Sequence, residues 1–91
     1  IREYIWFMET KQLYTPPNSG NPYYLGKHNS TGYYFYYEPQ RVTVLDYAFL
    51  STITEKADGT VIYADRCSIS EDKLAKMGIT FKKIPRDISR L

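Results

Sequence analysis

Basic side chains are concentrated in the last thirteen residues of this 91-residue chain. Lys82, Lys83, Arg86 and Arg90 stand against one acid, Asp87, which gives this stretch a charge of +3 although the whole chain has a net charge of only +2. Concentrated positive charge is typical of proteins that contact a polyanion, and lysine and arginine are the side chains that pair with phosphates. The alternative is that these four cations are solvated charges near a chain end.

A second polar stretch, residues 26–32, contains Lys27 and His28 between two tyrosine-rich runs. This loop could probe a DNA groove, and aromatic side chains interleaved with Lys27 and Arg41 could stack on nucleic-acid bases. In the structural alternative, His28 is an ordinary turn residue and residues 33–37 form a strand with rings on both faces of a sheet. If an aromatic face is exposed instead, it would favour a docking surface.

Catalytic and metal-binding arrangements are not indicated. His28 and Cys67 are the only imidazole and thiol, so neither a zinc site nor a Cys–His nucleophilic pair has supporting residues. Asp65 follows an apolar run at its carboxyl end, where open α/β sheets place ligands. It could orient a ligand, hold a cation or support hydrolysis with a second carboxylate. The alternative is a turn carboxylate that pairs with Arg66 or accepts backbone N–H groups.

The first half of the chain predicts antiparallel strands. Residues 4–8 are aromatic and β-branched, which favours a buried strand. Residues 15–22 are rich in Pro, Asn and Gly and predict a loop. The extended runs 23–25 and 33–37 flank the polar loop and predict a hairpin.

After residue 42 the apolar residues recur at helical spacing instead of alternating, which predicts a helix that ends at residues 58–59. Thr43 and Asp46 match the capping box, with Thr43 as the N-cap and Asp46 reaching back from the N3 position. Val42 and Tyr47 are then placed for a hydrophobic staple. Apolar residues follow at helical spacing, which gives the predicted helix one mostly apolar face.

A second helix is predicted after Ser70, which is placed as its N-cap. Ile69 and Leu74 are placed for a second staple, and Gly78 is placed to end the helix. Residues 79–84 then read as the final strand.

These elements predict an α/β (α+β) fold. The second half alternates strand, helix, strand, helix, strand, which implies parallel pairing through crossovers. We expect a mixed sheet of about five strands with a C-terminal β-α-β-α-β unit and two helices mainly on one face. Residues 61–64 are apolar throughout and should lie centrally. In the last strand Ile79 and Phe81 should face the core, and its lysines would guard an edge.

Length and composition favour a single domain over residues 1–91, with globular values of 43% apolar and 24% charged residues. One cysteine excludes an internal disulfide. No apolar run approaches the ~20 residues of a membrane span, so no membrane partner is expected. There is no signal-peptide layout, and the missing initiator Met suggests a piece excised from a longer protein.

Several strings of this sequence resemble the C-terminal end of bacterial site-specific adenine DNA methyltransferases. These belong to the restriction–modification class that includes the modification subunits of type III systems. The strings are YIWFMETK (4–11), GNPYYLG (20–26), GYYFYYE (32–38), VIYAD (61–65) and FKKIPRDI (81–88).

The resemblance implies a cytoplasmic parent enzyme that transfers a methyl group from S-adenosylmethionine to adenine N6 in DNA. The parent's cofactor-binding glycine loop has no match here. The tetrapeptides Thr15-Pro16-Pro17-Asn18 and Asn21-Pro22-Tyr23-Tyr24 look superficially like its Pro-Pro-Tyr motif, but neither has all the parts in order. No catalytic, cofactor-binding or metal-binding residue therefore carries over. The segment is implied to be a non-catalytic accessory domain.

Two function classes follow for this domain. The leading hypothesis is DNA engagement, with Lys82, Lys83, Arg86 and Arg90 on phosphates and the loop of Lys27 and His28 at a groove. The rival is a protein-interaction module whose tyrosine-rich strands dock on the parent's catalytic domain or on a restriction subunit.

Overall fold

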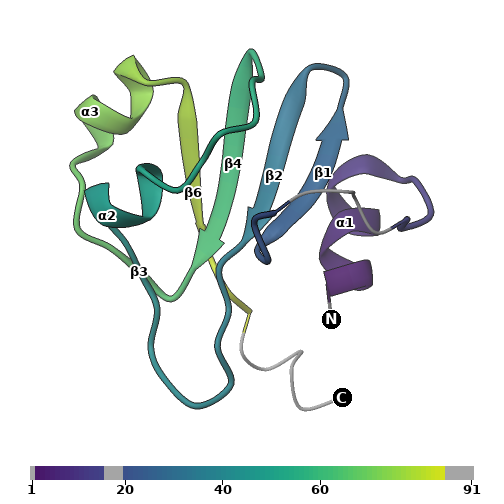
Figure 1. Cartoon of the computed structure of the whole chain (residues 1–91), viewed down its shortest axis with the longest axis horizontal. Coiled ribbons are helices and arrows are strands. Elements are labelled where there is room, and N and C mark those ends of the chain that lie inside the picture. Colours follow the sequence, from purple (N-terminus) through teal and green to yellow (C-terminus); the bar gives the residue numbers. More distant parts are fainter. Residues whose placement is uncertain (1, 16–19, 86–91) are drawn as a thin grey trace.

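A computed structural model describes residues 2–15 and 20–85 of the chain (Figure 1). Its elements are α1 (Arg2–Thr10), β1 (Tyr24–His28), β2 (Thr31–Phe35), β3 (Val44–Leu45), α2 (Tyr47–Leu50), β4 (Gly59–Ala64), β5 (Arg66–Cys67), α3 (Glu71–Lys76) and β6 (Ile79–Lys83). The predicted α/β class is confirmed: within these ranges there is a mixed four-stranded sheet, a two-stranded sheet and three helices.

The main sheet has the strand order β1-β2-β4-β6. Strands β1 and β2 form an antiparallel hairpin, and β2, β4 and β6 run parallel. Helices α2 and α3 lie in the connections between the parallel strands, so the predicted β-α-β-α-β unit is confirmed. The prediction that residues 61–64 are central is also confirmed, because β4 lies between β2 and β6. Strand β6 is an edge strand, as its lysines indicated.

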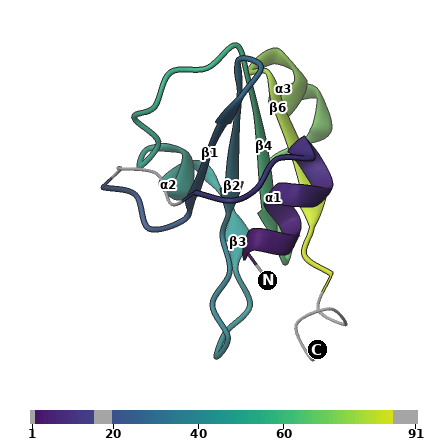
Figure 2. The same cartoon turned by 90° about the vertical axis from the view of Figure 1, so that its right-hand side faces the viewer.

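The sheet is covered by different helices on its two faces (Figure 2). On one face, Phe49 of α2 and Leu74 of α3 belong to a buried cluster with Tyr34 and Ile62. On the other face, α1 contributes to a second buried cluster, made of Ile5, Trp6, Leu25, Tyr33, Phe35 and Ile84. Two helices therefore share one face as predicted, and a third covers the opposite face.

The predicted strand at residues 4–8 is wrong, because this run lies inside helix α1. Helical spacing places Ile5, Trp6 and Thr10 against the sheet, where all three are buried. Phe7 and Met8 point outward and are exposed. Tertiary packing of Ile5 and Trp6 overrides the β-propensity of these residue types.

The predicted helix from Thr43 to residues 58–59 is also wrong. Helix α2 has only four residues, and its N-cap is Asp46, whose Oδ1 accepts a hydrogen bond from the Phe49 amide at 2.8 Å. Residues 44–45 form β3 instead, paired in parallel with β5. The predicted staple is absent, since Val42 and Tyr47 are 54% and 53% exposed. The hydroxyl of Thr52 bonds back to the Phe49 carbonyl, which satisfies the end of the short helix.

The hairpin and the second helix are confirmed. The turn between β1 and β2 consists of Asn29 and Ser30, which both have positive φ, so the loop is shorter than predicted. Ser70 is the N-cap of α3 and accepts from the Lys73 amide at 3.4 Å. Gly78 adopts φ +70° after the helix, in the left-handed region where glycine is favoured. Part of the predicted loop 15–22, residues 16–19, lies outside the described residues.

Candidate functional site

Of the four basic residues predicted to bind phosphates near the end of the chain, the structure describes Lys82 and Lys83, which lie on opposite faces of the sheet. Lys82 Nζ lies 2.6 Å from Glu9 Oε2 and forms an ion pair with helix α1. Lys83 is exposed and follows Lys82 in β6, so its side chain points to the opposite face of the sheet. The predicted contacts of Arg86 and Arg90 lie outside the described residues.

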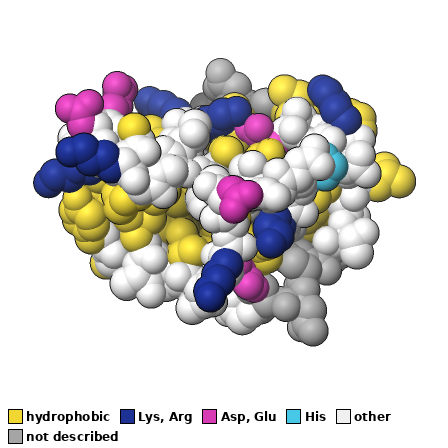
Figure 3. Space-filling model, turned by 90° about the horizontal axis from the view of Figure 1, so that it is seen from above, with side chains coloured by type: hydrophobic (Ala, Val, Ile, Leu, Met, Phe, Trp, Pro, Cys, Tyr) yellow, Lys and Arg dark blue, Asp and Glu magenta, His cyan; other side chains and the backbone are white. Residues whose placement is uncertain are grey.

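The loop of Lys27 and His28 lies far from these lysines. It ends β1, at the opposite edge of the sheet from β6 and near the start of β2. Three strand spacings separate the two edges, which is about 14 Å. Lys27 Nζ donates to the Lys56 carbonyl at 3.3 Å, and His28 is half-buried. Figure 3 shows lysines and arginines interspersed with acids on the upper face. The structure therefore does not bring the two predicted basic groups together.

Asp65 has a structural role. Its side chain is nearly buried, and Oδ2 accepts a hydrogen bond from the Thr43 amide at 2.9 Å. The Thr43 hydroxyl in turn accepts from the Asp65 amide at 3.1 Å and donates to the Tyr36 carbonyl at 2.7 Å. The alternative of a carboxylate that accepts backbone N–H groups is confirmed. Across residues 2–15 and 20–85, no three His, Cys, Asp or Glu side chains are grouped to hold a metal ion.

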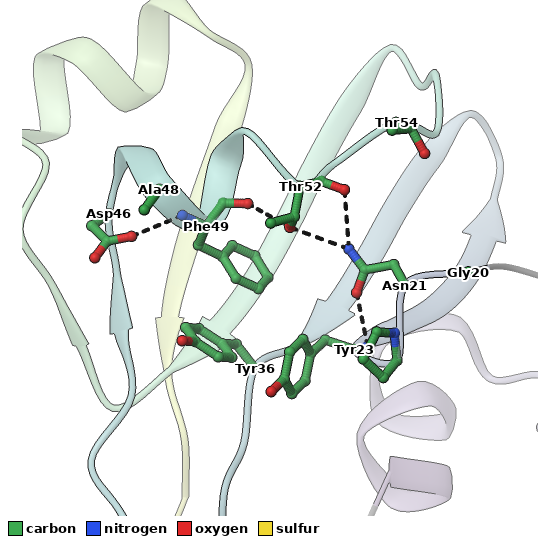
Figure 4. Close-up of a pocket in the computed structure, with 10 residues that line it drawn as sticks. Gly20, Asn21, Tyr23, Tyr36, Asp46, Ala48, Phe49, Thr52 and Thr54 are labelled. Atoms are coloured by element: carbon green, nitrogen blue, oxygen red, sulfur yellow. Dashed lines mark hydrogen bonds between the residues drawn. The ribbon is translucent and has the colours of Figure 1, made fainter.

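A different site is formed between α2 and the segment before β1 (Figure 4). It is a pocket of about 560 Å³, lined by Gly20, Asn21, Pro22, Tyr23, Tyr36, Asp46, Ala48, Phe49, Thr52 and Thr54. We call it the aromatic pocket, because three rings, those of Tyr23, Tyr36 and Phe49, lie together in its lining. Tyr23 and Tyr36 come from the two tyrosine-rich runs of the sequence and remain half-buried.

The three rings support one another. Tyr36 and Phe49 are stacked, with ring centroids 4.3 Å apart and an interplanar angle of 18°. Tyr23 meets Tyr36 edge-on at 4.7 Å. The Tyr23 hydroxyl donates to Glu38, and this hydrogen bond raises the pKa of Tyr23 above its ordinary value. The guanidinium of Arg41 donates to the Tyr36 hydroxyl at 3.4 Å. The ring orientations are therefore fixed by a polar network next to the pocket.

Asp46 supplies charge to the pocket. One oxygen, Oδ1, caps α2, while Oδ2 has no hydrogen-bond or ion-pair partner among the residues that the structure describes. Asn21 joins the loop to the end of α2: its Nδ2 lies 3.4 Å from Thr52 Oγ1, and its Oδ1 accepts from the Tyr23 amide. The Arg41 guanidinium already lies over the Tyr36 ring, 5.7 Å from its centroid. A further organic cation, such as an alkylammonium or a guanidinium group, would be attracted mainly by the Asp46 carboxylate beside the half-buried Tyr23 ring.

The sequence identified the tyrosines of this pocket but not the pocket itself. Asp46 was assigned to the N3 position of a long helix and Phe49 to its apolar face. Aspartate is itself a favourable N-cap residue. Reading Asp46 as the N-cap would have predicted a helix that starts there, three residues before Phe49.

Within the described residues, no helix is both long and apolar enough to cross a membrane. Comparison with known proteins gives no match for this chain, either to a protein family, to a curated protein or to a solved structure.

Proposed function

We propose that this chain is a protein-interaction module that takes a basic side chain of a larger protein into the aromatic pocket. One observation carries the proposal: Tyr23 and Tyr36 line the same pocket as Asp46, whose second carboxylate oxygen has no partner among the described residues. Following the sequence resemblance, the partner would be the catalytic domain of an S-adenosylmethionine-dependent adenine DNA methyltransferase, or a restriction subunit.

Charge complementarity favours a cationic ligand for this pocket. The carboxylate of Asp46 attracts an arginine or lysine side chain and repels phosphate. A cation over a half-buried ring such as that of Tyr23 contributes about 0.5–1 kcal/mol. An exposed ion pair adds up to about 1 kcal/mol. Together they correspond to roughly tenfold in affinity, so the pocket supplies selectivity within a larger interface.

Replacing Asp46→Asn tests the proposal, because asparagine is also a good N-cap and keeps the helix start intact while removing the charge. The probe is a short blocked peptide with a central arginine in a glycine–serine background. We expect the variant to bind it about three- to tenfold more weakly than the unmodified chain, with an unchanged melting temperature.

The matched control is Asp72→Asn, which makes the same charge change in the first turn of α3, away from the pocket lining. It should leave peptide affinity unchanged. Equal affinities for the unmodified chain and Asp46→Asn would contradict the proposal.

A second candidate function is DNA engagement, as an accessory domain of such a methyltransferase. The observation that favours it is Lys83, which is exposed, has no partner among the described residues and belongs to the closing segment of charge +3. Its side chain would contact phosphate together with Arg86 and Arg90, and binding would weaken steeply with salt.

Two double variants separate DNA engagement from non-specific attraction. Lys83→Glu with Arg86→Glu reverses the charges of the closing segment, and Lys73→Glu with Lys76→Glu makes the same change on exposed lysines of α3. If the domain engages DNA, the first pair of substitutions reduces the affinity for duplex DNA far more than the second pair does. It also lowers the slope of log affinity against log salt concentration by about two. Equal losses in fluorescence anisotropy for both pairs would exclude it.

A further inference from the structure

Among the described residues, one row of backbone groups of strand β6 has no hydrogen-bond partner at the edge of the sheet. Its described strand neighbour is β4. The Gly78 carbonyl accepts from the Thr60 amide, and the Ile84 amide donates to the Ala64 carbonyl. In a parallel ladder this register directs the even-numbered residues of β6 toward β4. The N–H and C=O groups of Ile79, Phe81 and Lys83 therefore point away from the sheet.

A groove of about 470 Å³ runs beside these groups. Helix α3 contributes Glu71, Leu74 and Ala75 to it, and β6 contributes Ile79, Thr80 and Phe81. Since side chains alternate along a strand, Ile79 and Phe81 lie on the same face. A strand added at this edge would place every second side chain on that face, next to the groove. Strand addition uses open backbone groups together with a groove that receives every second side chain.

The charge of Lys83 indicates which kind of side chain an added strand would carry. Lys83 lies on the same face as Ile79 and Phe81 by strand alternation and has no carboxylate partner among the described residues, whereas its neighbour Lys82 is already paired with Glu9. A carboxylate on the incoming segment would complement Lys83. A basic side chain would be repelled beside Lys83, whereas Glu71 in the groove lining disfavours an acidic side chain next to α3.

We propose that β6 accepts an extended segment of a partner protein as an additional antiparallel strand, with an apolar side chain in the groove and an acidic side chain beside Lys83. This surface is separate from the aromatic pocket and does not depend on it. Antiparallel pairing is chosen because it is slightly more stable per residue than parallel pairing.

The experiment uses the complete 91-residue chain and a blocked octapeptide that alternates valine and threonine around a central leucine and one glutamate. Amide NMR follows the titration. We expect the amides of Ile79, Phe81 and Lys83 to shift and to gain protection from hydrogen exchange, while those of Thr80 and Lys82, already directed at β4, change little.

Two N-methylated forms of the probe provide the control, each methylated at alternate residues. Strand addition requires one form to lose at least roughly tenfold in affinity and the other to bind nearly as well as the parent peptide, because only alternate amides face β6. In addition, Lys83→Gln and exchange of the probe's glutamate for glutamine should each weaken binding about twofold to threefold, without a further loss when combined.

Three outcomes would overturn the proposal. The two methylated probes could bind equally, the probe could fail to bind at millimolar concentration, or the chain could pair with a second copy through β6. The last would appear as concentration-dependent protection of the same three amides without any peptide.

Discussion

Asp46 has a structural role through one carboxylate oxygen, and in the proposed function its charge would also serve recognition. One oxygen holds the start of α2 by accepting from the Phe49 amide, and the other has no partner among the described residues at the rim of the aromatic pocket. The same residue therefore positions the Phe49 ring and carries the charge that would bind a cation. Asparagine retains the first role and loses the second, which is why this single substitution separates recognition from folding.

Gly26 tests the packing of α1 on the hairpin. It has φ +143°, and a Cβ built there would lie 3.0 Å from Cη2 of the buried Trp6 ring. We predict that Gly26→Ala lowers the free energy of unfolding by about 1–3 kcal/mol, through backbone strain and overpacking. Urea denaturation measures this loss. Gly20→Ala is the control, since nothing lies within 4 Å of its built Cβ, and an equal loss there would refute the packing argument.

Glu9 is expected to make stability depend on pH. Burial raises its pKa, but the hydrogen bonds from Lys82 and Tyr63 outweigh this and hold the pKa below the ordinary value of 4.5. Because the folded-state pKa is depressed, the carboxylate stabilises the fold above about pH 4.5, and this contribution is lost as the pH falls through the folded-state pKa.

Glu9→Gln should therefore reduce stability at neutral pH by up to about 1 kcal/mol and flatten its decline below about pH 5. Urea unfolding at a series of pH values gives both quantities. An unchanged pH profile would show that the ion pair with Lys82 contributes nothing to stability.

At the scale of elements, local signals predicted the second half of the fold. Each signal acts within a few residues of the element that it predicts. The apolar run 61–64 predicts β4, Ser70 predicts the start of α3, and Gly78 predicts the end of α3 before β6. Helix α1 could not be predicted in this way, because its residue types favour a strand and its packing depends on Trp6 meeting Gly26, twenty positions later. Helix α2 was misplaced because Thr43 and Asp46 both suit a cap.

The two-stranded sheet β3–β5 is tied to the main sheet through Thr43 and Asp65. The Thr43 hydroxyl is fully buried and bonds the Tyr36 carbonyl and the Asp65 amide. We predict that Thr43→Val, which keeps the shape but leaves these groups without partners, costs about 2–3 kcal/mol of unfolding free energy. Thr80→Val, at an exposed strand position, should stay within about 0.5 kcal/mol. Similar small changes in both variants would contradict the assigned role of Thr43.

At the scale of the whole molecule, the basic side chains are arranged differently from what the sequence predicted. Lys82 is paired, Lys83 lies on the opposite face, and Lys27 is at the far edge of the sheet. The alternative of a strand with rings on both faces is confirmed in β2, where Tyr34 packs on one face and Tyr33 and Phe35 on the other. The half-buried tyrosines meet Phe49 and Asp46 in one pocket. The sequence shows which basic and aromatic residues are present. Which of them lie together in space depends on how the chain crosses over between the parallel strands. The pocket combines residues 20–23, residue 36 and residues 46–54, which have no shared local signal.

The most direct test of recognition through the aromatic pocket is an NMR titration of the complete chain with the arginine peptide, following backbone amides and aromatic side chains together. We predict that the largest changes fall on Tyr23, Tyr36, Phe49 and the amides of residues 46–52, and that a peptide with glutamine in place of arginine produces far smaller ones. Changes spread over the surface, or equal responses to the two peptides, would contradict a cation-binding pocket at this site.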